Sequence, residues 1–510
     1  MRTTAAPNVS KHIRGVSRSD LGGEINIKSI LALEEQIREY ETAIVKLKRA
    51  RNSLLNVSKL PPEVLGDIFR WNVTLKDDFG GLGKESHDFL LVCHHWFEVA
   101  SSTPEIWSFW GNTPNDWARW SHRSGTAPLD LVLDANSVDG PFGSTQLDIL
   151  RDRADRNAIR RIHLKATDSE LLSSVVKSLT TGSGVLRPSS VESLVLRNES
   201  NELLEISDFF AYNRFPKLQR LELFNCRHSS WDLITSQIVT LVTLELDLYS
   251  IEPTPTIPQV LSVLTSNPTL RKVSLFGHVN PDGGGGNPFP RAELCHLKEL
   301  ELGGDPQDVF GVLSRLDYPR QMENLDVTVY ECATEDISQI VGPQVRDYLQ
   351  HCGRSQSRLG LSLSSGYDIE LRVGDVDGID FSVPAPGRVN TFMNVTINSN
   401  QAPSEGRLEK ATLDLIAHVP LEEVVYFRVR GRLVAVADIF AQLLNLRGLH
   451  FERAPPPIVF PMANPGGEGE IFPSLQYIFL DRVVVSGSDG WEPLITFLLW
   501  RAGSGRRLHS

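Results

Sequence analysis

Residues 218–226 read Leu-Gln-Arg-Leu-Glu-Leu-Phe-Asn-Cys. The leucines occupy the apolar positions of the pattern L-x-x-L-x-L, and the intervening residues are polar. Because side chains alternate between the two faces of a strand, Leu221 and Leu223 point to one side and Glu222 points to the other. A single short strand cannot bury its own apolar side, so the pattern predicts a fold only where it recurs.

The pattern recurs along most of the chain, with Ile, Val, Met or Phe allowed at the apolar positions. Copies begin at Ile159, Val191, Leu218, Leu241, Leu270, Leu297, Met322, Leu446 and Leu475. Neighbouring copies are mostly about 23 to 32 residues apart, which is close to the period of leucine-rich repeats. Residues 129–510 therefore resemble irregular leucine-rich repeats. We expect an α/β fold in which short strands stack into a curved parallel sheet and helices such as 257–264 return the chain.

The repeat pattern degrades between about residues 331 and 432. Strands are still predicted there, at 359–363, 369–373, 389–397 and 424–429, but without the register of the repeat. Either the return helices are missing from this region or its repeats are degenerate.

The outward position of the repeat carries acidic residues in four of five successive copies. These positions are Glu222, Glu245, Ser274, Glu301 and Asp326, and parallel stacking would align them as a column. The acids Glu222, Glu245, Glu301 and Asp326 are candidates for binding a basic or polar target segment. The competing interpretation is a solvated face that keeps the protein soluble.

Residues 58–107 carry a different apolar pattern on the N-terminal side of the repeats. The stretch contains Leu60-Pro61-Pro62-Glu63-Val64-Leu65, then Ile68-Phe69, then Val92-Cys93-His94-His95-Trp96, then Ile106-Trp107. Pro62 is suited to the first turn of a helix, and the apolar residues after it recur at helical spacing. Two short helices cannot shelter that much apolar surface, so a partner or a neighbouring domain must cover the remainder.

These residues resemble an F-box, and together with the repeats they resemble an expanded fungal family of F-box proteins. The matching stretch covers about a tenth of the chain. It departs from the family pattern at His94 and in a longer connection, residues 72–88, with a glycine-rich tip. The resemblance implies a substrate-recognition adaptor of a Skp–cullin–F-box ubiquitin ligase, whose F-box docks on a Skp-type adaptor and whose repeats bind a target protein. The residues chosen as buried adaptor contacts are Leu60, Pro61, Ile68, Val92 and Trp96. The alternative is a non-degradative interaction scaffold in which the F-box packs internally.

Three further segments complete the expected organisation. Residues 1–26 are polar and basic, and we expect a disordered tail. Residues 27–57 predict a coiled-coil-like helix with a heptad seam, interrupted by Arg51, at Ile30, Leu33, Ile37, Tyr40, Ile44, Leu47 and Leu54. Residues 30–54 could form a homodimer, or the helix could fold back on its own domain. Residues 108–128 predict a helical joint rich in tryptophan.

Composition excludes several classes of function. The 510 residues carry a net charge of −12 with a pI near 5.6, which disfavours nucleic-acid binding. No apolar run reaches the roughly 18 residues of a membrane helix. The five cysteines are scattered, which argues against a disulfide framework and against a zinc site. We therefore expect the protein in a reducing compartment, the cytosol or the nucleus. No catalytic motif is present. Cys93, His94 and His95 do not form a thiol catalytic site, because adjacent residues on a helix point in different directions. We therefore expect no enzyme activity, cofactor or metal.

Overall fold

The chain is represented by a computed structural model whose described residues form two compact units. The first unit consists of the described residues 27–73 and 85–103, and the second consists of Thr74, Lys84 and the described residues from 104 onward. The expected tail over residues 1–26 lies outside the described residues. These are 27–74, 84–111, 117–134, 144–156, 159–180, 190–212, 214–228, 231, 238–250, 254–280, 291–319, 322–330, 332, 336–351, 359–365, 368–375, 390–398, 405–431, 437–440, 442–453, 472–483, 492–503 and 508.

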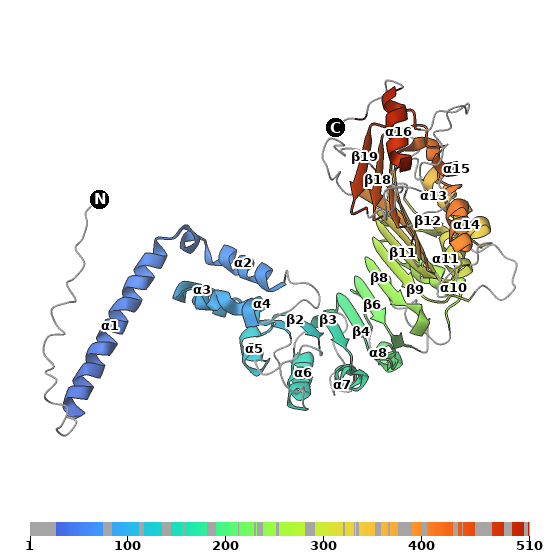
Figure 1. Cartoon of the computed structure of the whole chain (residues 1–510). Helices are drawn as coiled ribbons and strands as arrows, with labels where there is room; N and C mark the ends of the chain where they lie inside the picture. The colour runs from blue at the N-terminus through green and yellow to red at the C-terminus, as the bar shows by residue number, and fades with distance from the viewer. Residues whose placement is uncertain are drawn as a thin grey trace. The chain divides into compact units, whose positions relative to one another are not determined.

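The first unit is helical (Figure 1). Its longest element is α1, Ile27–Ser53, which confirms a helix in the predicted heptad segment. A short turn of helix, η3 (Asn56–Lys59), leads to α2 (Pro62–Thr74), in which Pro62 occupies the first helical position as expected. The chain then forms η4 (Lys84–Leu91) and α3 (His94–Ser101). Within residues 72–88, positions 75–83 lie outside the described residues.

The tryptophan-rich joint differs from the sequence prediction. The chain forms a short helix α4 (Pro104–Trp107), then the strand β1 (Phe109–Trp110), and only Trp117–Ser124 continues as a helix, α5. A helix over the whole segment is wrong because β1 pairs with β2 as the first strand of the sheet. The Trp110 and Trp117 rings stack with centroids 5.2 Å apart, and each indole N–H donates to a backbone carbonyl, so both bulky side chains are buried without an unpaired donor.

One sheet dominates the second unit. Among the described residues it has 15 strands in the order β1-β2-β3-β4-β6-β8-β9-β11-β13-β16-β15-β14-β17-β18-β19. All nine sequence repeats fall on strands, in a mostly parallel sheet, as predicted. The strands are β2 (Leu129–Asp134), β3 (Ile159–Ala166), β4 (Ser193–Asn198), β6 (Arg220–Phe224), β8 (Thr243–Asp247), β9 (Lys272–Phe276), β11 (Glu299–Gly304), β13 (Asn324–Tyr330), β14 (Leu359–Ser365), β15 (Asp368–Asp375), β16 (Asn390–Asn398), β17 (Val424–Gly431), β18 (Gly448–Glu452) and β19 (Tyr477–Asp481).

The region where the repeat pattern degrades is a reversed meander. β15 pairs antiparallel with both β14 and β16. The three strands occur in the sheet in the opposite order to the chain, because β16 and not β14 pairs with β13. β16 then continues parallel to β13, and β14 continues parallel to β17. Two residues join β14 to β15, too few for a return helix, so one return helix is missing there. Helices are nevertheless present elsewhere in the region, at Gly342–His351 and Glu405–Ile416.

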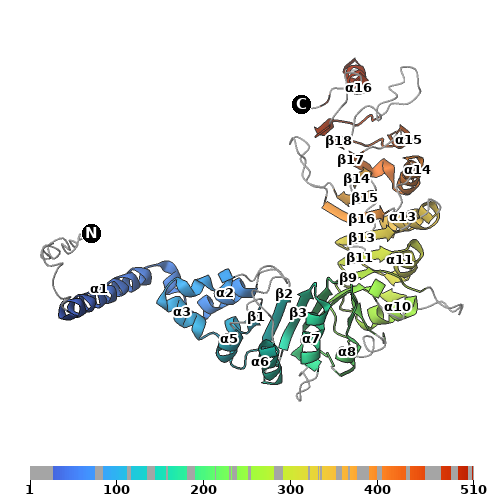
Figure 2. The same ribbon diagram turned by 60° about the horizontal axis from the view of Figure 1, so that its bottom comes forward.

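Helices lie along one side of this sheet (Figures 1 and 2), and the apolar side chains of the strands are buried beneath them. In α10 the apolar residues Ile257, Val260, Leu261 and Leu264 are buried, and a capping box of Thr256 and Gln259 begins the helix. Within the described part of the chain, no helix has the length and apolarity required to cross a membrane. The other helices of this unit are α6 (Ser144–Arg156), α7 (Ser169–Thr180), α8 (Ser207–Tyr212), α11 (Pro306–Leu313), α13 (Gly342–His351), α14 (Glu405–Ile416), α15 (Ala437–Phe440) and α16 (Glu492–Gly503).

Candidate protein-interaction surfaces

Helix α2 carries two apolar stripes. Leu65, Phe69 and Val73 recur at intervals of four residues and are buried. Val64 and Ile68 form a second stripe, and their exposed fractions are 44% and 46%. A helix whose role was only to pack against its own domain would need one apolar stripe, so the second is available for a partner.

The segment leading into α3 extends this exposed apolar surface. The ring of Phe69 stacks on Phe89 with centroids 4.5 Å apart and contacts Trp96 at 5.1 Å, which places η4 and α3 beside α2. Leu91 and Val92 are 85% and 55% exposed in the same segment. We define the α2–α3 surface as the exposed apolar residues Val64, Ile68, Trp71, Leu91, Val92 and Phe97.

The five predicted adaptor contacts all keep some exposure. Pro61, Ile68 and Val92 are exposed, whereas Leu60 and Trp96 are half-buried. Trp96 contributes its ring to the aromatic cluster around Phe69. The structure adds two exposed apolar residues that the sequence prediction did not select, Val64 on α2 and Leu91 in η4. Helical spacing predicts the apolar positions of α2 but does not say which of its two stripes is buried.

The predicted column on the repeats is present. Strand register aligns Glu222, Glu245, Ser274, Glu301 and Asp326 across β6, β8, β9, β11 and β13. The column continues with Asn394 on β16, whose amide donates to Asp326 at 3.1 Å. Burial raises the pKa of Asp326, although this hydrogen bond opposes the shift.

Basic residues on the same strand and on neighbouring strands pair with acids of the column. Arg197 and Arg220 both pair with Glu222, which is 2% exposed. Lys272 lies 2.8 Å from Glu245 and 3.8 Å from Glu301. Burial alone would lower the pKa of Lys272, but the hydrogen bond and charge of Glu245 outweigh it and the pKa is raised. Glu222 thus lies in an internal ion pair, and Glu245, Glu301 and Asp326 are the more accessible members of the column.

An aromatic surface follows the column at the carboxyl ends of the strands. A hollow of about 270 Å³ is lined by Phe224, Phe276 and the charged residues Arg197, Glu222 and Asp247 among others. Phe224 and Tyr249 are 52% and 49% exposed. The alternation of side chains along a strand could have identified this aromatic surface, because Phe224, two positions after Glu222, points to the same face of the sheet.

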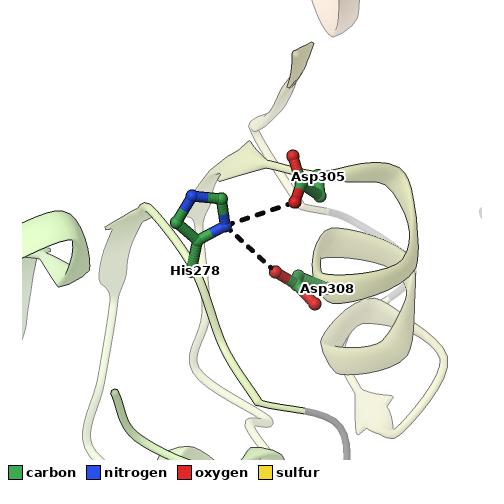
Figure 3. Close-up of side chains that lie close together, drawn as sticks. All are labelled: His278, Asp305 and Asp308. Carbon is green, nitrogen blue, oxygen red and sulfur yellow. Dashed lines mark ion pairs between the residues drawn. The ribbon is translucent and has the colours of Figure 1, made fainter. Parts of the chain in front are cut away.

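A group of three polar side chains adjoins this aromatic surface at the ends of β9 and β11 (Figure 3). His278 Nδ1 lies 3.2 Å from Asp305 and 3.6 Å from Asp308, and the ring of Tyr249 packs edge-on against the imidazole. Burial and the nearby carboxylates raise the pKa of Tyr249 to about 12. The three ligand atoms lie close enough to share one cation. His278 Nδ1 is close to both carboxylates, so the arrangement is also explained without a metal. We define the strand-end surface as Phe224, Tyr249, Phe276, His278 and Tyr330.

The cysteine and histidines of α3 form no catalytic arrangement among themselves. Cys93 precedes the helix and is half-buried, and His94 Nδ1 pairs with Glu98 at 3.2 Å on the next turn. His94 thus contacts Glu98 on the surface of its own helix.

Comparison with known proteins adds little. No protein-family model matches the chain, and no curated protein matches its sequence. Among solved structures, the chain is similar to one described as the crystal structure of the Rad7 and Elc1 complex in yeast, with 12% sequence identity over 89% of this chain and 98% of that chain. The TM-score is 0.27, which is too low for the likeness to support an argument about function.

Proposed function

We propose that this chain is a substrate-recognition adaptor of a Skp–cullin–F-box ubiquitin ligase. In this role the α2–α3 surface docks on a Skp-type adaptor, and the repeats hold a target protein. The chain itself contributes no catalytic group. It places the target close to a conjugating enzyme and so raises the effective concentration of the reacting groups.

One observation carries the proposal: two residues that the F-box resemblance selects, Ile68 on α2 and Val92 before α3, are exposed while neighbouring residues of the same pattern are buried. Ile68 and Val92 were chosen as adaptor contacts from the sequence, and both side chains are about half exposed. Neighbouring Leu65 and Phe69, which match the same pattern, are buried. The pattern therefore has two parts, one that holds the helices together and one that remains for a partner.

The target-binding end is proposed on the side of the sheet that carries the acidic column. Glu245, Glu301 and Asp326 would contribute charge, and the adjoining strand-end surface would contribute aromatic area. Aromatic residues are enriched in the energetically dominant centres of protein interfaces, whereas internally paired charges contribute less. We therefore place the main contact at Phe224 and Tyr249.

Co-purification of the full chain with a Skp-type adaptor tests the first contact. We expect the wild-type chain to bind, and Ile68→Glu or Val92→Glu to weaken binding at least about tenfold, because each buries a charge in an apolar contact. Arg70→Ser is the matched control, since Arg70 is exposed and lies neither three nor four residues from Val64, Ile68 or Trp71 on α2. Circular dichroism establishes that each variant keeps its helices.

The alternative function, a scaffold whose F-box packs internally, gives the opposite result. A wild-type chain that fails to bind the adaptor would remove the ligase proposal. Binding that survives both glutamate substitutions would instead show that the docking surface is misassigned.

A further inference from the structure

Helix α1 is exposed on every side. All described side chains from Ser29 to Arg51 are exposed, including the seam residues Ile37, at 54%, and Leu47, at 71%. A lone helix in water is only marginally stable, and most helical stability in proteins comes from packing of an apolar face. The seam therefore requires a partner that covers it along its length.

Charge is unevenly distributed along α1. Between Glu34 and Glu41 four of the five charged side chains are acidic, whereas between Lys46 and Arg51 all four are basic. A parallel pair of such helices places like charge beside like charge. An antiparallel pair places the acidic segment of one helix beside the basic segment of the other.

The positions that flank the seam give the same preference. In a parallel pair, Glu34 would face Ser29 of the second copy and Glu41 would face Gln36, so no opposite charges meet. Arg51 would face Arg51 of the second copy. In an antiparallel pair with Tyr40 opposite Ile44, Glu34 faces Lys48 twice, once on each side of the symmetry axis. Arg51 then lies beside Glu34, and the single like-charged flanking pair is Glu41 with its copy.

We infer that α1 pairs with α1 of a second copy of this chain in antiparallel orientation, with Ile37 opposite Leu47 and Tyr40 opposite Ile44. The second copy is the occupant because its charge pattern complements that of α1 when the direction is reversed. The pairing is independent of adaptor docking, and it can be measured without a Skp-type protein.

Charge reversal in the full chain tests the pairing and its direction together. Sedimentation and light scattering at low ionic strength should show a wild-type dimer. Glu34→Lys alone and Lys48→Glu alone should each dimerise about tenfold more weakly, because both flanking pairs become like-charged. An equimolar mixture of the two variants should recover the dimer, since each pair then joins lysine to glutamate. Glu39→Lys is the matched control, because Glu39 lies away from the seam and should leave dimerisation unchanged.

Each other outcome overturns the inference. A monomeric wild-type chain would mean that another protein's helix or the chain's own N-terminal segment covers the seam. A dimer that neither single variant weakens would mean a parallel arrangement or another interface. Failure of the mixture to recover the dimer would refute the pairing of Glu34 with Lys48.

Discussion

Replacing Glu222 by glutamine should destabilise the repeats, although Glu222 was selected from the sequence as a target-binding residue. Its side chain is 3% exposed and pairs with Arg197 at 2.8 Å and with Arg220. Glutamine keeps the size and one carbonyl acceptor but removes the negative charge. The two guanidinium groups would then lie beside each other without a counter-ion at that position.

The expected loss follows from the number and exposure of these contacts. A hydrogen bond to a charged group contributes about 1.5–3 kcal/mol to stability. The Arg197 and Arg220 side chains are 42% and 31% exposed, so water can solvate them after the change, and we take the lower part of the range for the pair. The predicted loss is about 2–3 kcal/mol in the free energy of unfolding. Domains typically have about 5–15 kcal/mol in total.

Urea unfolding followed by circular dichroism measures this loss, and hydrogen exchange of β4, β6 and β8 locates it. Glu301→Gln is the matched control in the same column. Its side chain is 29% exposed, Ser274 donates to it at 2.6 Å, and Lys272 is 3.8 Å away, so we expect a loss below about 1 kcal/mol. Equal losses for the two variants would refute the distinction between an internal ion pair and an accessible column.

Three further changes test other parts of the structure. Asn267→Ala should lower the free energy of unfolding in urea by about 3–5 kcal/mol, because the buried Asn267 side chain makes three hydrogen bonds to the backbone of Ile238, Leu241 and Val263. The control Asn445→Ala, at an exposed asparagine, should lower it by less than about 1 kcal/mol. Gly277→Ala should lower the thermal midpoint by several degrees, because Gly277 has a φ of 130° and an added Cβ would collide with the backbone of Tyr249. Burial, followed by the charge of Arg428, holds the pKa of His450 below its usual 6.5, so the unfolded chain binds the proton more readily and stability should fall as the pH drops below about 6.5. His450→Gln should flatten that fall in unfolding experiments between pH 7 and pH 5, and an unchanged profile would contradict the assignment.

Periodicity predicts the fold well where one strand and one return segment form each unit. The nine copies of L-x-x-L-x-L locate nine strands, because alternation of side chains is a local property of an extended chain. The reversal of β14, β15 and β16 could not be predicted in this way. Their order depends on which strand edges meet, and the alternation within each strand is the same for parallel and antiparallel pairing.

Site residues were predicted less completely because exposure is set by packing between elements. Helical spacing alone does not distinguish Leu65 from Ile68, but contact with η4 and α3 buries one side of α2 and leaves the other exposed. The acidic column was aligned correctly, yet Arg197, which pairs with Glu222, lies 25 residues earlier in the sequence. Such a partner is found only when the register of neighbouring strands is known.

The exposed apolar side chains of the first unit form two groups, and the two proposed contacts use different groups. Sixteen of the 24 exposed large hydrophobic side chains of the described residues lie between Ile30 and Phe97, although most described residues belong to the second unit. They fall on separate elements, with one group on α1 and at Leu54 and Leu55 directly after it, and the other on the α2–α3 surface. An antiparallel copy of α1 would cover the seam residues of the first group and none of the second group, so dimerisation would leave Ile68 and Val92 exposed. The two contacts can therefore be occupied together, and a dimer would present two adaptor-docking surfaces. Multivalent assembly of this kind raises the apparent affinity for a target that is itself repeated or dimeric.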